Sequence, residues 1–337
     1  METKNKTQHS ELRQDLITGD WVVIATGRAK RPEDFAKNSQ IVSENNVSEC
    51  FFCDPEKSGQ EKDVLIYKDK NGDWTLRVFP NKYPAFVGGK PQSLEEGPYF
   101  AMTGMGFHEV IATRDHHKQA ALMETMEIAE VFDAYQERYL DLMNKKDVNY
   151  ISIFHNHGKE AGASIAHPHS QLMAIPVISP YVELELDGSE KYHRQNRRCV
   201  FCVIAEYESQ AKKRVVFENE KFIAYCPFAS RAAFEVWIVP KKHSPYFERT
   251  TNEEKISLAE VFGKALNSVY KALGDPAYNF YIHTSPCDGK DYPHFHWHLE
   301  ILPHTAVWAG FELQTGIEIS TIPPEAAAEY LRKQLSN

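Results

Sequence analysis

One pattern of cysteines and histidines occurs twice along this chain of 337 residues. Each copy has a Cys-x-x-Cys pair, an apolar run ending in an isolated histidine, a stretch with helical apolar spacing and a histidine cluster. The pairs begin at Cys50 and Cys199, the isolated histidines are His116 and His243, and the clusters begin at His167 and His294. The last step is 51 residues in both copies (167 minus 116 and 294 minus 243). The shared order and spacing indicate an internal duplication.

The duplication predicts an α+β fold of two repeated halves, each an antiparallel sheet with one long helix. The apolar spacing places these helices over about residues 118–144 and 252–273. We expect the halves to be residues 1–180 and 181–337, with the junction between 176 and 198, where Ser179-Pro180 precedes a charged run. The first half is 22 residues longer between its Cys pair and isolated histidine (66 against 44). We expect this insertion within about residues 66–92.

Each half offers two thiolates and two imidazoles, which satisfy tetrahedral zinc and leave no position for water. The first set is Cys50, Cys53, His116 and His167, and the second is Cys199, Cys202, His243 and His294. His117 competes with His116 as a ligand, but the match to His243 favours His116. Closed sites of this kind are structural, so we predict two structural Zn²⁺ ions per chain.

The segment His167-Pro168-His169-Ser170-Gln171 carries the strongest chemical signal. On a strand, His167, His169 and Gln171 project from one face. An imidazole can attack phosphorus while a neutral amide donates to a phosphoryl oxygen, so we predict phosphoryl transfer with His169 as nucleophile. The preceding stretch from Asn156 to Ser164, which includes Gly162, is small and polar, as suits a backbone that approaches phosphate.

Two other interpretations of these histidines stay open. His-Pro-His alone can be a turn with surface histidines. The second cluster, His294-Phe295-His296-Trp297-His298, allows a nucleotide hydrolase in which His296 is the nucleophile.

Composition excludes several classes of protein. With 42% hydrophobic and 25% charged residues the chain reads as globular, and a net charge of −9 argues against a broad nucleic-acid surface. No apolar stretch reaches membrane-spanning length, and residues 1–15 are polar and charged, unlike a signal peptide. We expect a cytoplasmic protein.

Taken together, these residues resemble the galactose-1-phosphate uridylyltransferase family, a two-repeat transferase branch of the histidine-triad superfamily. Nearly the whole chain takes part in the resemblance. The matching segments are Asp20 to Pro32, Cys50 to Cys53, Val78 to Pro84, Asn156 to Gln171 and Gly310 to Glu312.

The resemblance implies ping-pong chemistry: His169 takes a nucleotidyl group from a nucleotide-sugar, releases a sugar 1-phosphate, and passes the group to a second sugar 1-phosphate. It implies a UDP-glucose–hexose-1-phosphate uridylyltransferase of galactose metabolism, and a homodimer. The residues implied to bind substrate are Arg28 and Arg31 for phosphate, Phe51, Phe52, Phe79 and Asn81 for the nucleoside, Asn156, Gly162, Ser164 and Gln171 for the phosphoryl group, and Gly310, Phe311 and Glu312 for the hexose.

Two features keep a second activity open. Lys82 follows Asn81, where better-known members carry an acidic residue. The segment Gly310 to Gly316 and the second Cys-x-x-Cys pair are similar to ADP-glucose phosphorylase of the same family. Adenylyl transfer is therefore the alternative, and a catalytically dead zinc-stabilised binding module is the non-enzymatic one.

Overall fold

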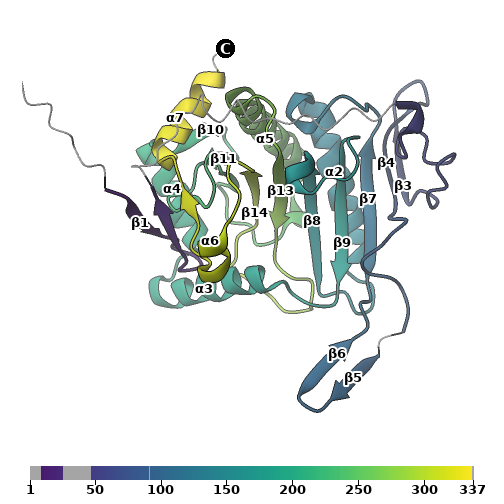
Figure 1. Ribbon diagram of the computed structural model, residues 1–337, viewed down its shortest axis with the longest axis horizontal. Coiled ribbons are helices and arrows are strands. Elements are labelled where there is room, and N and C mark those ends of the chain that lie inside the picture. Colours follow the sequence, from purple (N-terminus) through teal and green to yellow (C-terminus); the bar gives the residue numbers. More distant parts are fainter. Residues whose placement is uncertain (1–8, 26–46, 91, 336–337) are drawn as a thin grey trace, which may run out of the picture.

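A computed structural model describes residues 9–25, 47–90 and 92–335 of the chain. Its centre is a ten-stranded sheet in which every neighbouring pair is antiparallel (Figure 1). In spatial order the strands are β10 (Val215–Glu218), β11 (Phe222–Tyr225), β12 (Val236–Pro240), β14 (His298–Pro303), β13 (Tyr278–His283), β8 (Tyr150–His157), β9 (His169–Ile175), β7 (Phe107–Thr113), β4 (Trp74–Pro80) and β3 (Leu65–Lys68).

The strand order is mirrored about the contact between β8 and β13. Counting outward from this contact, the first half supplies β8, β9, β7, β4 and β3, and the second supplies β13, β14, β12, β11 and β10. Each strand therefore has a counterpart at the same rank on the other side. At the contact itself, Asn156 of β8 is paired in register with Asn279 of β13.

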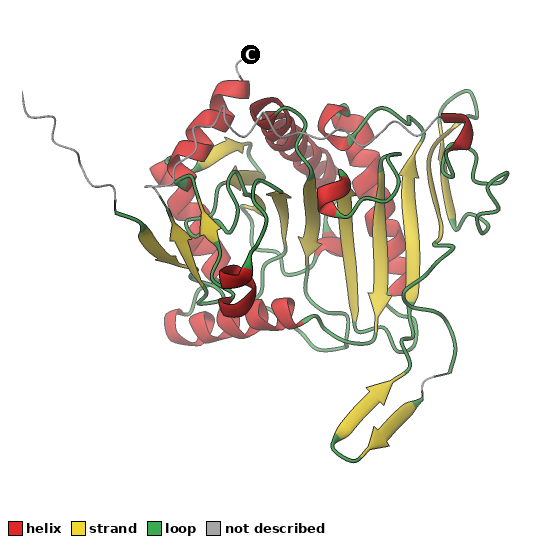
Figure 2. Cartoon of the chain, viewed as in Figure 1, coloured by secondary structure: helices red, strands yellow, loops and turns green. Residues whose placement is uncertain are grey.

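Three helices cover one face of the sheet: α2 (Thr125–Leu142), α5 (Asn252–Leu273) and α7 (Pro324–Leu335). Figure 2 shows α2 and α5 behind the strands. Helix α5 spans the predicted residues because Thr251 and Glu254 form a capping box at its start and Gly274 ends it in a left-handed conformation, φ 68°. Helix α2 is shorter than predicted, since a turn of 3-10 helix, η4 (Ala120–Leu122), precedes it.

The opposite face differs between the two halves. In the second half, α3 (Pro180–Asn196) and α4 (Val200–Ala211) cover it, with Phe201 packed among Trp237 and Val239. The predicted junction is thus not an irregular linker: Ser179 caps a helix with Pro180 in its first turn. In the first half, the described residues place only a small cluster on this face, which includes Phe52 and Phe79. We call this face of the sheet, in the first half, the open face.

The remaining elements lie at the margins of the sheet. They are β1 (Glu11–Gln14), β2 (Trp21–Ile24) and β15 (Ile319–Ser320) in a three-stranded sheet, the hairpin of β5 (Ser93–Glu96) and β6 (Tyr99–Met102), helix α6 (Gly310–Thr315), and the short 3-10 turns η3 (Val47–Glu49), η5 (Lys159–Ala161) and η6 (Phe247–Arg249). The described part of the chain contains no helix that is long and apolar enough to cross a membrane.

The insertion in the first half lies later than predicted. Because β3 and β4 hold the ranks of β10 and β11, most of the extra residues follow β4. They lie between β4 and β7, where the chain also forms the projecting β5–β6 hairpin (Figure 1). The expected range of about 66–92 therefore begins too early, at the β3–β4 strand pair, and includes only the first part of this connection.

Candidate active site

His169 is the first residue of β9, and its ring lies on the open face. Its Nδ1 is 2.8 Å from the carbonyl oxygen of His167, to which it must donate a proton. The remaining lone pair is therefore on Nε2. Burial lowers the pKa of His169, so the ring is neutral near pH 7. The Phe52 ring lies 5.0 Å from it, edge to face. This is a neutral imidazole held in one tautomer, as a nucleophile requires.

Gln171, two residues further on the same face, is oriented by His108 of β7. The backbone N–H of Ala85 donates to Nδ1 of His108 (3.2 Å), so its Nε2 carries the proton. This Nε2–H donates to Oε1 of Gln171 at 2.8 Å. The Nε2 amide of Gln171 is thereby left to donate elsewhere. Asn81 lies beside this pair, with its Nδ2 3.1 Å from Nε2 of His108.

The loop after β8 approaches the same face. Gly158 and Gly162 have φ values of 83° and 86°, in the left-handed region that favours glycine. A Cβ on Gly158 would lie 2.7 Å from Cβ of Ala277 in the second half, so only glycine fits this close approach. The β8–β9 register pairs His155 with Ser170 and so places Asn156 opposite His169. Ser164 is exposed on the loop. An anionic group beside His169 would thus meet the side-chain amide of Asn156.

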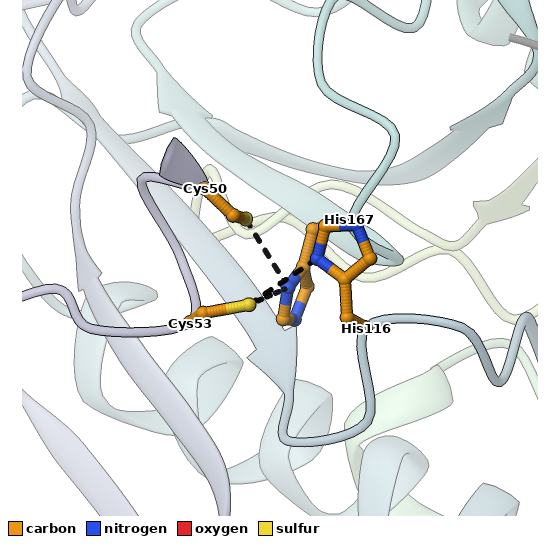
Figure 3. A group of neighbouring side chains, drawn as sticks. All are labelled: Cys50, Cys53, His116 and His167. Atoms are coloured by element: carbon orange, nitrogen blue, oxygen red, sulfur yellow. Dashed lines mark hydrogen bonds between the residues drawn. The ribbon is translucent and has the colours of Figure 1, made fainter. Parts of the chain in front are cut away.

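The first predicted metal group is assembled as expected. Donor atoms of Cys50, Cys53, His116 and His167 all lie within 4.8 Å of one another (Figure 3). Nδ1 of His116 is 3.2 Å from Sγ of Cys53, and Nδ1 of His167 is 3.5 Å from both sulfurs. Nε2 of His167 donates to the carbonyl of Thr113 at 2.6 Å, which leaves Nδ1 free to bind a metal. Two thiols and two imidazoles suit zinc.

The second group corrects one predicted ligand. The donors within 4.8 Å of one another are Cys199, Cys202, His243 and His296, and His294 is not among them. His294 instead packs beside the Tyr292 ring. The physical reason is strand register: in each half the donor histidine comes two residues before the strand begins, at His169 in β9 and at His298 in β14. The step from His243 is therefore 53 residues (296 minus 243), and the equal spacing of 51 was misleading.

The same geometry bears on the alternative nucleophile. Nδ1 of His296 faces the two thiols, 3.4 Å from Sγ of Cys202 and 3.8 Å from Sγ of Cys199. His296 is thus the counterpart of His167, not of His169. The residue that corresponds to His169 is His298, whose Nδ1 donates to the carbonyl of His296 at 3.2 Å.

A third group of donors was missed in the sequence. Glu185, His283, His298 and Glu300 are all buried, and their donor atoms lie within 4.8 Å of one another, so the group could also hold a cation. Burial lowers the pKa of His298, but Glu185 and Glu300 outweigh that and raise it to about 10. Glu185 belongs to α3, a segment whose charged run predicted a junction between the halves. The alternation of His298 and Glu300 on one strand was the signal that could have been used.

The other predicted site residues fall in three places. Arg28 and Arg31 lie outside the described residues. Phe52 and Phe79 are buried near His169, with ring centroids 5.5 Å apart, whereas Phe51 is 55% exposed. Gly310, Phe311 and Glu312 lie on α6, apart from this cluster. Glu312 lines a cavity of about 650 Å³ together with Asn279, His304 and Trp308, and His169 is not part of that lining.

Comparison with known proteins gives consistent matches. The family model described as galactose-1-phosphate uridyl transferase, N-terminal domain, matches residues 1–178, and a domain of unknown function (DUF4921) matches residues 95–337. An ADP-glucose phosphorylase of Arabidopsis thaliana is 35% identical over 97% of this chain and 94% of its own length. A galactose-1-phosphate uridylyltransferase of Thermotoga maritima is 31% identical over 96% of this chain and 98% of its own.

Two solved structures extend these similarities to the fold. The structure of an Arabidopsis thaliana ADP-glucose phosphorylase with bound ADP-glucose matches with a TM-score of 0.80 and 31% identity, over 96% of this chain and 99% of that one. A structure of a uridylyltransferase matches with a TM-score of 0.75 and 25% identity, over 97% of this chain and 99% of that one.

Proposed function

From the premise that this chain belongs to the galactose-1-phosphate uridylyltransferase family and is a nucleotidyltransferase, we propose that it transfers a nucleotidyl group between sugar phosphates through a covalent intermediate on His169. The observation that carries the proposal is the tautomer of His169. Its Nδ1–H donates to a backbone carbonyl, so the lone pair on Nε2 is available for attack.

The transfer takes place in two displacement steps at the α-phosphorus. Nε2 of His169 attacks the α-phosphorus of a nucleotide-sugar, an N–P bond forms, and the bond from this phosphorus to the bridging oxygen breaks, which releases the sugar 1-phosphate. The ring then carries a positive charge, which the hydrogen bond to the carbonyl of His167 stabilises. A phosphate oxygen of the acceptor attacks the same phosphorus, and the N–P bond breaks to restore the neutral imidazole.

The neighbouring residues bind and orient the phosphoryl group. Gln171 donates from the amide end that His108 leaves free, and Asn156 and Ser164 donate from the loop side. Gly162 lets the backbone approach closely. Arg28 and Arg31 balance phosphate charge, as the family resemblance implies. Phe52, Phe79 and Asn81 bound the nucleoside side of the site, with Phe51 at its exposed edge.

Both Cys/His groups have the donors to hold Zn²⁺ as structural ions. Cys50, Cys53, His116 and His167 would hold a zinc ion that adds rigidity, because His167 provides the carbonyl that fixes the ring of His169. The second ion belongs on Cys199, Cys202, His243 and His296. We also infer that residues 1–180 and 181–337 are the two copies of a duplicated unit; the mirrored strand order supports this.

A uridylyl group is the first assignment for the transferred nucleotide. The family model and the Thermotoga maritima relative both carry a galactose-1-phosphate uridylyltransferase description. On this assignment UDP-glucose is the donor and galactose 1-phosphate the acceptor, with Gly310, Phe311 and Glu312 on the hexose side.

An adenylyl group is the second candidate, and specific observations favour it. The Arabidopsis thaliana relative at 35% identity is an ADP-glucose phosphorylase, and the solved structure of such an enzyme contains ADP-glucose. On this assignment ADP-glucose is the donor and inorganic phosphate the acceptor.

Intact-protein mass after incubation with UDP-glucose or ADP-glucose, without an acceptor, tests both candidates. A gain of one uridylyl group that galactose 1-phosphate discharges would establish the first. A gain of one adenylyl group that inorganic phosphate discharges would establish the second. The absence of any adduct with either donor would overturn the covalent mechanism.

A further inference from the structure

We propose that Asn279, a residue of the second half, is a positioning residue for the nucleotidyl transfer because it decides which end of the Asn156 amide faces the phosphoryl group. The inference rests on the proposed function and adds to it a residue outside the catalytic half. It starts from the contact between β8 and β13, where Asn156 and Asn279 are direct cross-strand partners on the face that carries His169.

The orientation of Asn279 is settled by a backbone carbonyl. One end of its amide lies 2.9 Å from the carbonyl oxygen of Ala161, in the loop after β8. A carbonyl oxygen only accepts, so this end is the Nδ2 amide group. The same Nδ2 lies 2.8 Å from Asn156. The atom of Asn156 that faces it must therefore be the acceptor, Oδ1.

This assignment fixes the other end of Asn156. Its Nδ2 points toward Gly162 and lies 3.8 Å from the position that a Cβ on Gly162 would occupy. Because Gly162 has no side chain, the space beside that donor is left for a ligand. Asn156 thus presents N–H groups, not a carbonyl oxygen, beside His169 on the neighbouring strand. With the amide reversed, an oxygen would face the phosphoryl oxygens and repel them.

His304 completes the arrangement on the far side of Asn279. Its Nε2 lies 2.6 Å from Oδ1 of Asn279 and donates to it. Both hydrogen-bonding ends of Asn279 are therefore engaged, which prevents rotation of its amide by 180°. The loop is held in the same way, since the bond from Asn279 to Ala161 joins the turn between Gly158 and Gly162 to the second half. The second half thereby fixes a donor of the first.

The test compares rates of formation of the nucleotidyl-His169 adduct in a single turnover at saturating donor, followed by rapid quenching and intact mass. The donor is whichever of UDP-glucose and ADP-glucose labels the wild-type protein. Asn279→Asp keeps the size of the side chain but removes its N–H groups, so Asn156 must turn its own Nδ2 toward residue 279 and its oxygen toward the phosphoryl group. We expect the rate to fall about 100-fold, as for loss of a single donor to a transition state.

Two further variants separate positioning from a general structural effect. In an Asn156→Ala background, Asn279→Asp should lower the rate by less than about threefold, because the residue it acts through is gone. Asn267→Asp is the matched control: Asn267 lies on α5, on the opposite face of the sheet, where its Nδ2 donates to the carbonyl of Ala121 at 2.9 Å, so this variant makes the same chemical change away from the site. It should leave the rate within about twofold of wild type.

A smaller and graded effect is expected at His304. His304→Ala removes the donor that holds Oδ1 of Asn279 and should lower the rate about threefold to tenfold. His304→Gln, which keeps an N–H donor, should restore most of that loss.

The results that would overturn the inference are distinct from failure of the proposed function. If Asn279→Asp reacts within threefold of wild type, or slows the reaction equally with and without Asn156, Asn279 does not act through Asn156. If neither donor labels the wild-type protein, the proposed function is wrong and the inference falls with it.

Discussion

The two halves place a histidine at the same position in the sheet and give it opposite surroundings. His169 begins β9 and His298 begins β14, and each donates Nδ1–H to the carbonyl two residues earlier. The residues that surround the two histidine rings differ. The next residue on the same face is Gln171 in one half and Glu300 in the other.

This difference determines the state of each ring. Nε2 of His298 lies 3.3 Å from Glu300 and 3.5 Å from Glu185, and these carboxylates raise the pKa of His298 to about 10 against the effect of burial. Burial lowers the pKa of His169, whose neighbour on the strand is an uncharged amide. The same strand position therefore carries an imidazole of lowered pKa in one half and of raised pKa in the other, according to the charge of its neighbours.

The largest expected effect concerns which histidine takes the nucleotidyl group. His169→Ala should lower adduct formation by at least about 10⁴-fold, because the attacking atom is lost. Mapping of labelled peptides from the wild-type protein should place the group on His169. A label on the peptide that carries His298 would reverse the assignment of the two halves.

A carboxylate introduced into the first half, at the position that Glu300 holds in the second, should also slow adduct formation strongly. Gln171→Glu puts a carboxylate where Glu300 lies in the second half, so it removes a donor and repels the phosphoryl oxygens. We expect the rate of adduct formation to fall about 10²- to 10³-fold. Gln171→Leu, which removes the donor without adding charge, is the comparison and should be less impaired. Equal rates for the two variants would show that charge is not what distinguishes the halves.

The buried charges of the second half should matter for stability. Glu185→Gln removes a carboxylate that lies 3.0 Å from Nδ1 of His283 and faces His298, and we expect the free energy of unfolding to fall by about 3–5 kcal/mol. The matched control on the same helix is Glu190→Gln. Glu190 forms an exposed ion pair with Arg194 at 2.6 Å, so its loss should cost less than about 0.5 kcal/mol. Urea unfolding monitored by circular dichroism measures both, and similar losses would contradict the role given to the buried group.

The smallest expected effect on catalysis comes from the Cys/His group of the second half. Cys50→Ser and Cys199→Ser should each lower the zinc content from two ions to one and reduce the melting temperature. Only Cys50→Ser should also slow adduct formation clearly, because its group includes His167, which holds His169. Metal analysis and the single-turnover rate, measured on the same samples, would show whether the two ions differ in this way.

Local signals in the sequence predicted a good part of this molecule. Helix α5 spans its predicted residues because its capping box and final glycine can be read directly from the chain. The first Cys/His group was also found, since Cys-x-x-Cys with two matched histidines leaves few alternatives. The error at His294 came from assuming equal spacing, whereas the step from His243 to the ligand His296 is two residues longer than the step from His116 to His167.

Features that depend on tertiary assembly were out of reach. Glu185 lies in a helix that looked like a charged junction, and only the packing of α3 on the sheet brings it to His283 and His298. The orientation of Gln171 depends on His108 from another strand, and that of Asn156 depends on Asn279 from the other half. The spacing of such residues in the sequence does not indicate that they are in contact.

The antiparallel contact between β8 and β13 has a consequence for the origin of a chain of this kind. A single five-strand unit would end in a strand with unpaired backbone groups, which readily recruits another chain. A second copy turned by a half rotation would cover that edge with the equivalent strand. Fusion of two such copies would turn the contact between two molecules into a contact inside one chain. The residues on the two sides of that contact could then change independently. Asn156 and Asn279 would then face each other across the former boundary, and a residue of one copy would support the site of the other.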